Sequence, residues 1–194
     1  MTTHSFTRSV LVAVLAVLGA GPAFAQTPAS PASAAAQPSF PATSFLAPTK
    51  ATWDSTRTLV LGIVEAMPED KYDFKPTPAQ RTFRDVAIHL IGENYIFFSR
   101  VSGENLGSND RFNTLKNRDE IVKALRESYD YGAKVWAGLT EEKALEMIEG
   151  RGGQKVQRWS AILGAIQDNM NHYGNLVVYA RLNGLVPPRS APRN

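Results

Sequence analysis

The spacing of hydrophobic and polar positions along the chain predicts four long helices. Apolar residues recur every three to four positions over residues 48–67, 83–101, 117–139 and 160–183, and the strict alternation that is typical of strands is scarce. Prolines and polar residues separate these segments, and a proline cannot continue a helix. Four helices joined by one long and two moderate connections favour an all-α fold, a four-helix bundle.

Several residues indicate where these helices begin. Thr82 precedes the second segment and is followed three positions later by Asp85, which is the spacing of a capping box. Ser160 fits an N-cap of the fourth helix. Between the third and fourth helices we expect only a short helical turn within residues 140–148 and then a glycine-rich loop over residues 149–159.

The first 25 residues have the features of a secretory signal peptide. One cation, Arg8, precedes an apolar run at residues 10–20, and the small residues of an AFA triplet would allow cleavage before Gln26. The apolar run is shorter than the roughly 20 residues that a membrane span requires. We therefore expect residues 1–25 to be removed and the protein to be exported, periplasmic or secreted, without a permanent membrane anchor.

The segment after the cleavage site predicts a flexible tether. Residues 26–44 are rich in Pro, Ala and Ser and carry no charge, so they cannot bury enough apolar surface to offset the entropy of an ordered chain. We predict a disordered linker there, then one bundle domain over residues 45–188 and a short tail over residues 189–194. A domain of this size is large enough to bury a substantial core.

The composition excludes several classes of site and partner. The sequence has no cysteine, which excludes disulfides, thiol nucleophiles, cysteine zinc sites and iron–sulfur clusters. The formal net charge is +3, and loss of the signal peptide removes Arg8 and no acid, which lowers it by one to +2. Because the basic residues are dispersed among acids, we expect no nucleic-acid partner.

The fourth helix carries an acid and a histidine in the middle of its most apolar stretch. Asp168 and His172 are four positions apart, so their side chains lie on one face of the helix. They could form an ion pair on a solvated face, or a buried histidine hydrogen-bonded to the neighbouring acid. Apolar residues occupy most of the helix surface, which favours the bundle interior or a cleft. A buried carboxylate must be paired or coordinated.

His89 in the second helix has a similar setting. Without His4, which the signal peptide carries, His89 and His172 are the only histidines, and each lies among apolar residues with an acid one turn away. A lone core histidine is the ordinary interpretation of His89. Together with Asp168, however, two imidazoles form a competent ligand set for a divalent cation such as Zn, Ni, Mn or Fe. Glu93 could then be a fourth ligand, a hydrogen-bond acceptor for an imidazole, or a general base.

Three stretches of the chain resemble a known family. They are "MPEDKYDFKPTPAQRTFRDVAIHLIGENYIFFSRVSGE" at residues 67–104, "DEIVKALRESYDY" at residues 119–131, and "DNMNHYGNLVVYARLNGLVPP" at residues 168–188. In this order, they resemble the DinB-like family, the DinB/YfiT-like metal-dependent hydrolases. The resemblance covers most of the chain from about Trp53 to Pro188. It implies a four-helix bundle of the DinB/YfiT-like type with a divalent-metal site built from three side chains.

The resemblance places the three metal ligands on particular residues. The family histidine of the second helix corresponds to His89, and the H-x3-H pair of the last helix corresponds to Asp168 and His172. The departure is Asp168, where the family pattern has histidine. A carboxylate there changes the charge of the site and its metal preference, or weakens metal binding.

The resemblance and the residues together lead to three functional hypotheses. The first is a metal-dependent hydrolase of unknown substrate, in which the ion activates water, Glu93 is the candidate catalytic base, and Asn169, Asn171 and Asn175 contact the substrate or support the ligands. The second is a non-catalytic periplasmic protein that binds a small molecule. The third is a thiol-dependent transferase, as in relatives that use bacillithiol or mycothiol, although the export predicted for this chain argues against a cytosolic thiol.

The binding-protein hypothesis needs a pocket, and one set of aromatic residues could form it. The set consists of Tyr95, Phe97, Phe98, Trp136 and Tyr179. Plain core packing is the favoured interpretation of these side chains. Self-association as a homodimer is a further expectation, because apolar residues are spread widely around the fourth helix.

Overall fold

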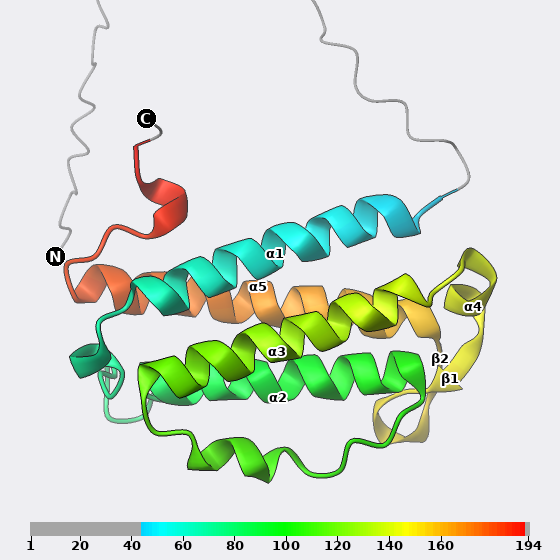
Figure 1. Cartoon of the computed structure of the whole chain (residues 1–194), viewed down its shortest axis with the longest axis horizontal. Helices are drawn as coiled ribbons and strands as arrows, with labels where there is room; N and C mark the ends of the chain where they lie inside the picture. The colour runs from blue at the N-terminus through cyan, green and yellow to red at the C-terminus, as the bar shows by residue number, and fades with distance from the viewer. Residues whose placement is uncertain (1–43, 193–194) are drawn as a thin grey trace, which may run out of the picture. The chain divides into compact units, whose positions relative to one another are not determined.

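The computed structural model describes residues 44–192, and four long helices form its framework (Figure 1). These are α1 (Leu46–Ala66), α2 (Phe83–Ser102), α3 (Arg118–Ala137) and α5 (Arg158–Leu182). The predicted helical fold is confirmed for this part of the chain. The predicted signal peptide and all of the predicted linker except Ser44 lie outside the described residues. Within the described range, no helix has the length and apolar character needed to cross a membrane.

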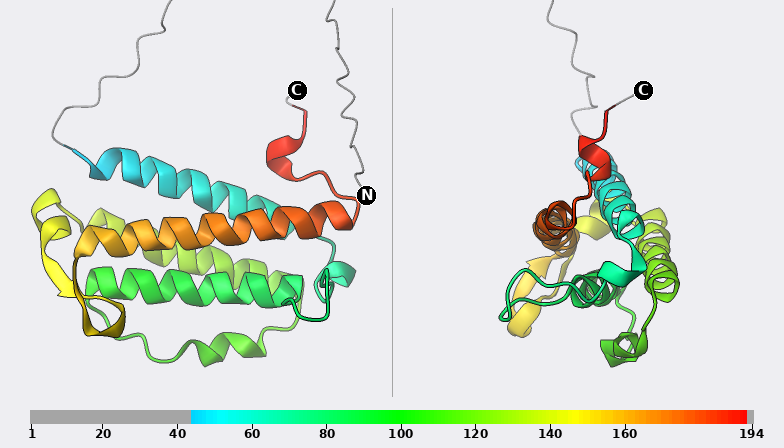
Figure 2. Two further views of the ribbon diagram at one scale, coloured as in Figure 1. Left: turned by 180° about the vertical axis from the view of Figure 1, so that it is seen from behind. Right: turned by 90° about the vertical axis from the view of Figure 1, so that its left-hand side faces the viewer.

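The four helices pack in a square arrangement, in which α1 and α2 each contact both α3 and α5 (Figure 2). Their shared interior contains a tightly packed aromatic cluster. The ring of Trp53 from α1 lies 4.7 Å from that of Phe98 and 5.0 Å from that of Tyr129, measured between centroids. Burial of such large apolar side chains is the main force that holds the helices together.

The aromatic residues that could have lined a pocket belong mostly to this core. Phe98, Trp136 and Tyr179 are buried among other core side chains, which confirms the core-packing interpretation for them. Tyr95 is partly exposed and stacks on Phe112, with 5.3 Å between the ring centroids. Phe97 is also only partly buried and packs against the core.

The start of α2 agrees with the sequence analysis, whereas the start of α5 does not. Thr82 Oγ1 accepts a hydrogen bond from the backbone N–H of Asp85 at 3.0 Å, and the Asp85 carboxylate accepts one from the N–H of Thr82 at 3.1 Å. The predicted N-cap at Ser160 is wrong. Helix α5 begins at Arg158, and the Ser160 hydroxyl donates to the carbonyl of Gln157. The preceding strand ends at Gln157 and leads directly into α5.

The connection before α5 is a β-hairpin, whereas its sequence predicted a glycine-rich loop. Strands β1 (Met147–Glu149) and β2 (Lys155–Gln157) pair in antiparallel register, with Ile148 opposite Val156. The preceding helix, α4, covers only Glu141–Leu145. The turn between the strands contains η3 (Arg151–Gly153), in which Gly152 and Gly153 have φ values of +71° and +78° that glycine adopts readily.

Three further short helices complete the described chain. They are η1 (Glu69–Lys71), η2 (Asn109–Thr114) and η4 (Pro188–Ser190). Helix η2 lies against α2, and η4 lies against α1. At the second contact, a Cβ atom built on Gly62 would stand 3.6 Å from the side chain of Pro188, which is ordinary van der Waals contact.

Candidate metal centre

Neighbouring helices bring the three predicted ligands together. His89 lies near the middle of α2, and Asp168 and His172 lie one turn apart on α5. One donor atom of each residue lies within 4.8 Å of the donor atoms of the other two. The rings of His89 and His172 meet edge to face, with 4.7 Å between their centroids. His172 Nε2 is 3.5 Å from Asp168 Oδ1. The solvated-face interpretation of the Asp168–His172 pair is therefore wrong, because a second helix covers it.

The chemistry of this cluster fits a metal ion. The side chains of His172 and Asp168 are only 13% and 24% exposed. The atoms Asp168 Oδ2 and His172 Nδ1 are buried and have no hydrogen-bond partner. Buried polar atoms are nearly always paired, so these two atoms are available to a bound partner such as a metal ion. Two imidazoles and one carboxylate are donors that divalent transition metals accept.

The electrostatic environment favours the neutral form of His89. Burial lowers the pKa of His89, and the positive charge of Arg81 lowers it further. A neutral imidazole has the free lone pair that a metal ligand needs.

Glu93 lies beside the cluster without a hydrogen bond to it. Its Oε1 atom is 4.0 Å from His89 Nδ1, which is longer than a hydrogen bond. Burial and the negative charge of Asp168 raise the pKa of Glu93, because both disfavour a second carboxylate charge. The geometry therefore supports three ligands, with Glu93 as a neighbouring acid that can exchange a proton.

The three asparagines of the fourth helix have different surroundings. Asn169 is fully buried and hydrogen-bonded to Tyr129 and Asn94, so the expectation that it contacts a substrate is wrong. Asn171 and Asn175 are exposed on the surface of α5. The buried partners of Asn169 were not recognised in the sequence, because an asparagine within an apolar helix gives no sign of what it will bond.

An open cleft of about 520 Å³ runs along α2 and reaches two residues of the site. His89 and Glu93 line it on the α2 side, together with Arg81 and Asp85, and the η2 region forms the opposite wall. Polar side chains predominate in the lining. The cleft gives a small polar molecule access to the α2 side of the cluster.

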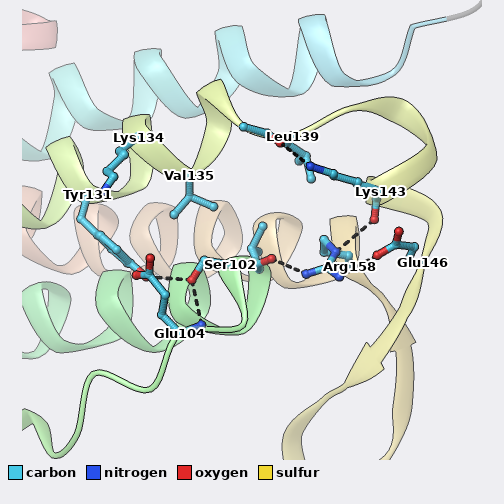
Figure 3. A pocket seen from close by; sticks show the side chains of 11 residues that line it. Ser102, Glu104, Tyr131, Lys134, Val135, Leu139, Lys143, Glu146 and Arg158 are labelled. Carbon is cyan, nitrogen blue, oxygen red and sulfur yellow. Dashed lines mark hydrogen bonds and ion pairs between the residues drawn. The ribbon is translucent and has the colours of Figure 1, made fainter.

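A second cavity, of about 350 Å³, lies at the other end of α2 (Figure 3). Arg158 is part of its lining, and its guanidinium donates to the carbonyls of Val101 and Lys143 and to the Glu146 carboxylate. On the opposite side of the cavity, the Tyr131 hydroxyl is hydrogen-bonded to Ser102 and Glu104. No residue of the metal cluster lines this cavity, so the cleft along α2 is the one that belongs to the candidate centre.

Comparison with known sequences determines the family. The sequence model of the DinB family matches residues 49–192, which is most of the chain. This protein belongs to the DinB family. The match includes α2 and α5 and confirms the family resemblance. No curated protein matches the sequence of this DinB-family chain.

Solved structures support the same fold. A DinB-like protein from Bacillus cereus matches with a TM-score of 0.64 and 15% identity, over 72% of this chain and 93% of that one. The DinB-like protein YjoA from Bacillus subtilis matches with a TM-score of 0.60 and 20% identity, over the same shares. A mycothiol-dependent maleylpyruvate isomerase matches with a TM-score of 0.57 and 12% identity, over 68% of this chain and 60% of the isomerase. At these identities, the likeness concerns the fold.

Proposed function

We propose that this DinB-family protein binds one divalent metal ion through His89, Asp168 and His172 and hydrolyses a small molecule at that site. The observation that carries the proposal is that three donor atoms, from two helices, lie within 4.8 Å of one another. The buried Asp168 Oδ2 and His172 Nδ1 atoms, which have no partner within the protein, support it. We further propose that the ion is Zn, Ni, Mn or Fe, because imidazole and carboxylate donors together suit these borderline ions.

The residues of the site have distinct roles in this proposal. When bound, a divalent cation acts as a Lewis acid that stabilises negative charge as it develops in a hydrolysis. His89 and His172 would hold the cation as neutral ligands, and Asp168 would offset part of its charge. Glu93 would take a proton from water, and the raised pKa brings this carboxylate closer to the range in which it can also return that proton. The cleft beside His89 and Glu93 would admit the substrate.

The metal content of the purified protein tests the proposal directly. We expect about one divalent ion per chain by elemental analysis, and we expect Ala substitutions of His89, Asp168 or His172 to reduce it strongly. Asn171→Ala is the matched control, since Asn171 is exposed on the same helix and lies next to His172. Wild-type protein that stays metal-free after exposure to excess ion would contradict the proposal, as would a His172→Ala variant with full metal content.

A second experiment distinguishes a hydrolase from a protein that binds the metal but has no catalytic activity. The metal-loaded protein should cleave at least one member of a panel of esters, amides and phosphoesters, and Glu93→Gln should lose that activity while keeping the metal. Full metal content without turnover of any panel member would favour the alternative, a non-catalytic binding protein. The partner in either case is a small molecule.

A thiol-dependent transferase is the second candidate, and the structural match to a mycothiol-dependent isomerase is the observation that favours it. In that case, activity should require an added low-molecular-weight thiol and should be absent with the panel of hydrolase substrates. Export bears on the choice, because such thiols are cytosolic. Mass spectrometry of the protein recovered from its natural host should show whether the chain begins at Gln26, as we propose for an exported protein.

A further inference from the structure

A continuous chain of buried polar side chains crosses the core beside the candidate metal centre. The Tyr129 hydroxyl donates to Asn169 Oδ1 at 2.6 Å, Asn169 Nδ2 donates to Asn94 Oδ1 at 2.9 Å, and Asn94 Nδ2 donates to Ser128 Oγ at 3.0 Å. All four residues are fully buried, with 0% exposure. The chain therefore joins α2, α3 and α5 inside an otherwise apolar interior.

The four polar side chains find all these hydrogen-bond partners only in one alignment of the helices. Asn169 Nδ2 also donates to the carbonyl of Ala165, and the Ser128 hydroxyl donates to the carbonyl of Leu125. A slip of α5 by one residue would move its side chains by about 1.5 Å along the helix axis and rotate them away from their partners. Apolar side chains could repack after such a slip, whereas buried amides would lose their hydrogen bonds.

The position of these amides in the sequence connects them to the metal centre. Asn169 directly follows Asp168 and precedes His172 by three positions, and Asn94 is five positions after His89. An α-helix is rigid over such short distances. The Asn94–Asn169 hydrogen bond therefore joins α2 to α5 within about two helical turns of His89, Asp168 and His172.

We propose that Asn94 and Asn169 are positioning residues, which set the register of α2 against α5 so that the three ligands converge. The proposal rests on the metal function proposed above. The competing explanation is that the amides only stabilise the fold. The two explanations differ in what happens when the whole polar chain is replaced by apolar side chains that pack well.

The decisive variant is Tyr129→Phe/Asn94→Leu/Asn169→Leu in the full chain. It removes donors and acceptors together, so no buried amide or phenol is left without a partner, and the Ser128 hydroxyl keeps its bond to Leu125. We expect a folded protein with a urea midpoint near that of the wild type. We expect its zinc affinity to fall roughly tenfold or more, the size of effect seen when groups that orient metal ligands are lost.

A matched control separates lost register from lost stability. Ile121 is a fully buried residue of α3 that takes no part in the polar chain. Ile121→Val should lower the urea midpoint without changing the zinc affinity. If the triple variant is stable and binds zinc as tightly as the wild type, the amides do not position the ligands.

A measurement without metal distinguishes failure of this inference from failure of the proposed function. The rings of His89 and His172 are 4.7 Å apart between centroids, so their protons should give a nuclear Overhauser effect in the metal-free wild type. The effect should be lost in the triple variant. Its persistence there would overturn the inference, whether or not the wild type binds zinc. Absence of zinc binding by the wild type, together with loss of the effect in the variant, would overturn only the metal function.

Discussion

Asp168 contributes a carboxylate to a cluster whose other two members are histidines. The resulting set of donors is two nitrogens and one oxygen, held by residues one turn apart on α5 and a third on α2. Carboxylates suit harder ions such as Mn²⁺, whereas imidazoles suit Zn²⁺ and Ni²⁺. The residue at position 168 should therefore influence which ion the site prefers.

The Asp168→His substitution tests this influence. We expect the affinity for zinc relative to manganese to rise on the order of tenfold, because the third ligand becomes a softer donor. Competition titrations with the two ions measure the ratio. Gln167→His is the control, since Gln167 is an exposed neighbour on α5 and its replacement adds a histidine outside the cluster. An unchanged ratio in Asp168→His would show that residue 168 does not coordinate the ion.

The sequence singled out the candidate ligand residues, and their convergence was a hypothesis that only the structure could test. His89 and His172 stood out because each has an acid one turn away in an apolar helix. Position 168 is 79 residues after position 89, and helical periodicity carries no information on which helices become neighbours across such a distance. The residues alone therefore offered this ligand set as one interpretation among others, and the family resemblance favoured it. The buried hydrogen bonds of Asn94 and Asn169 depend on the same tertiary contacts and could not be predicted.

Two helical glycines differ in how much space surrounds them. A Cβ atom on Gly132 in α3 would stand 3.0 Å from Cε2 of Phe98, whose ring packs against Trp53 and has little room to move. A Cβ atom on Gly174 in α5 would meet nothing within 4 Å. Both glycines lie inside helices, where alanine is intrinsically the better residue.

Alanine should therefore have opposite effects at these two positions. Gly174→Ala should stabilise the protein by about 0.5–1 kcal/mol, since it restricts the unfolded chain and strengthens the helix. Gly132→Ala should destabilise it by about 1 kcal/mol or more, because the cost of overpacking exceeds the gain in helix propensity. Urea unfolding of the two variants beside the wild type measures both effects. Stabilisation by both would mean that α3 and α2 can separate at little cost.

Secondary structure was predictable where the periodic pattern was long. The four helices extend over 20 to 25 residues, so their apolar spacing repeats several times. Strands β1 and β2 contain three residues each, too few for alternation to be recognised, and Gly152 and Gly153 in the turn are equally typical of a loop. The start of α5 was placed near Ser160 instead of Arg158, because the hairpin that leads into the helix was not recognised.

At the scale of the whole molecule, the candidate site would link two helices far apart in sequence. An ion held by α2 and α5 binds the folded chain and finds no preformed site in the unfolded one. Metal binding must therefore stabilise the folded state by an amount that depends on the concentration of free ion.

Thermal unfolding with and without zinc measures this coupling. Free zinc at about one hundred times its Kd should add about 2.7 kcal/mol to the free energy of unfolding. For a domain of this size, that corresponds to a rise in Tm of about 5–10 °C. EDTA should reverse the rise, and His172→Ala should show none. An equal rise in His172→Ala would place the bound zinc elsewhere on the protein.

The location of Asp168 and His172 on the last long helix has a consequence for biogenesis. While the ribosome is still extending the chain, His89 is the only one of the three donors that has been made, and a single imidazole holds an ion weakly. Capture of an ion by the proposed site would therefore wait until translation has passed residue 172 and α5 has docked. For a protein that is translocated before it folds, the supply of ions at its destination, and not that in the cell interior, would then decide which metal it carries.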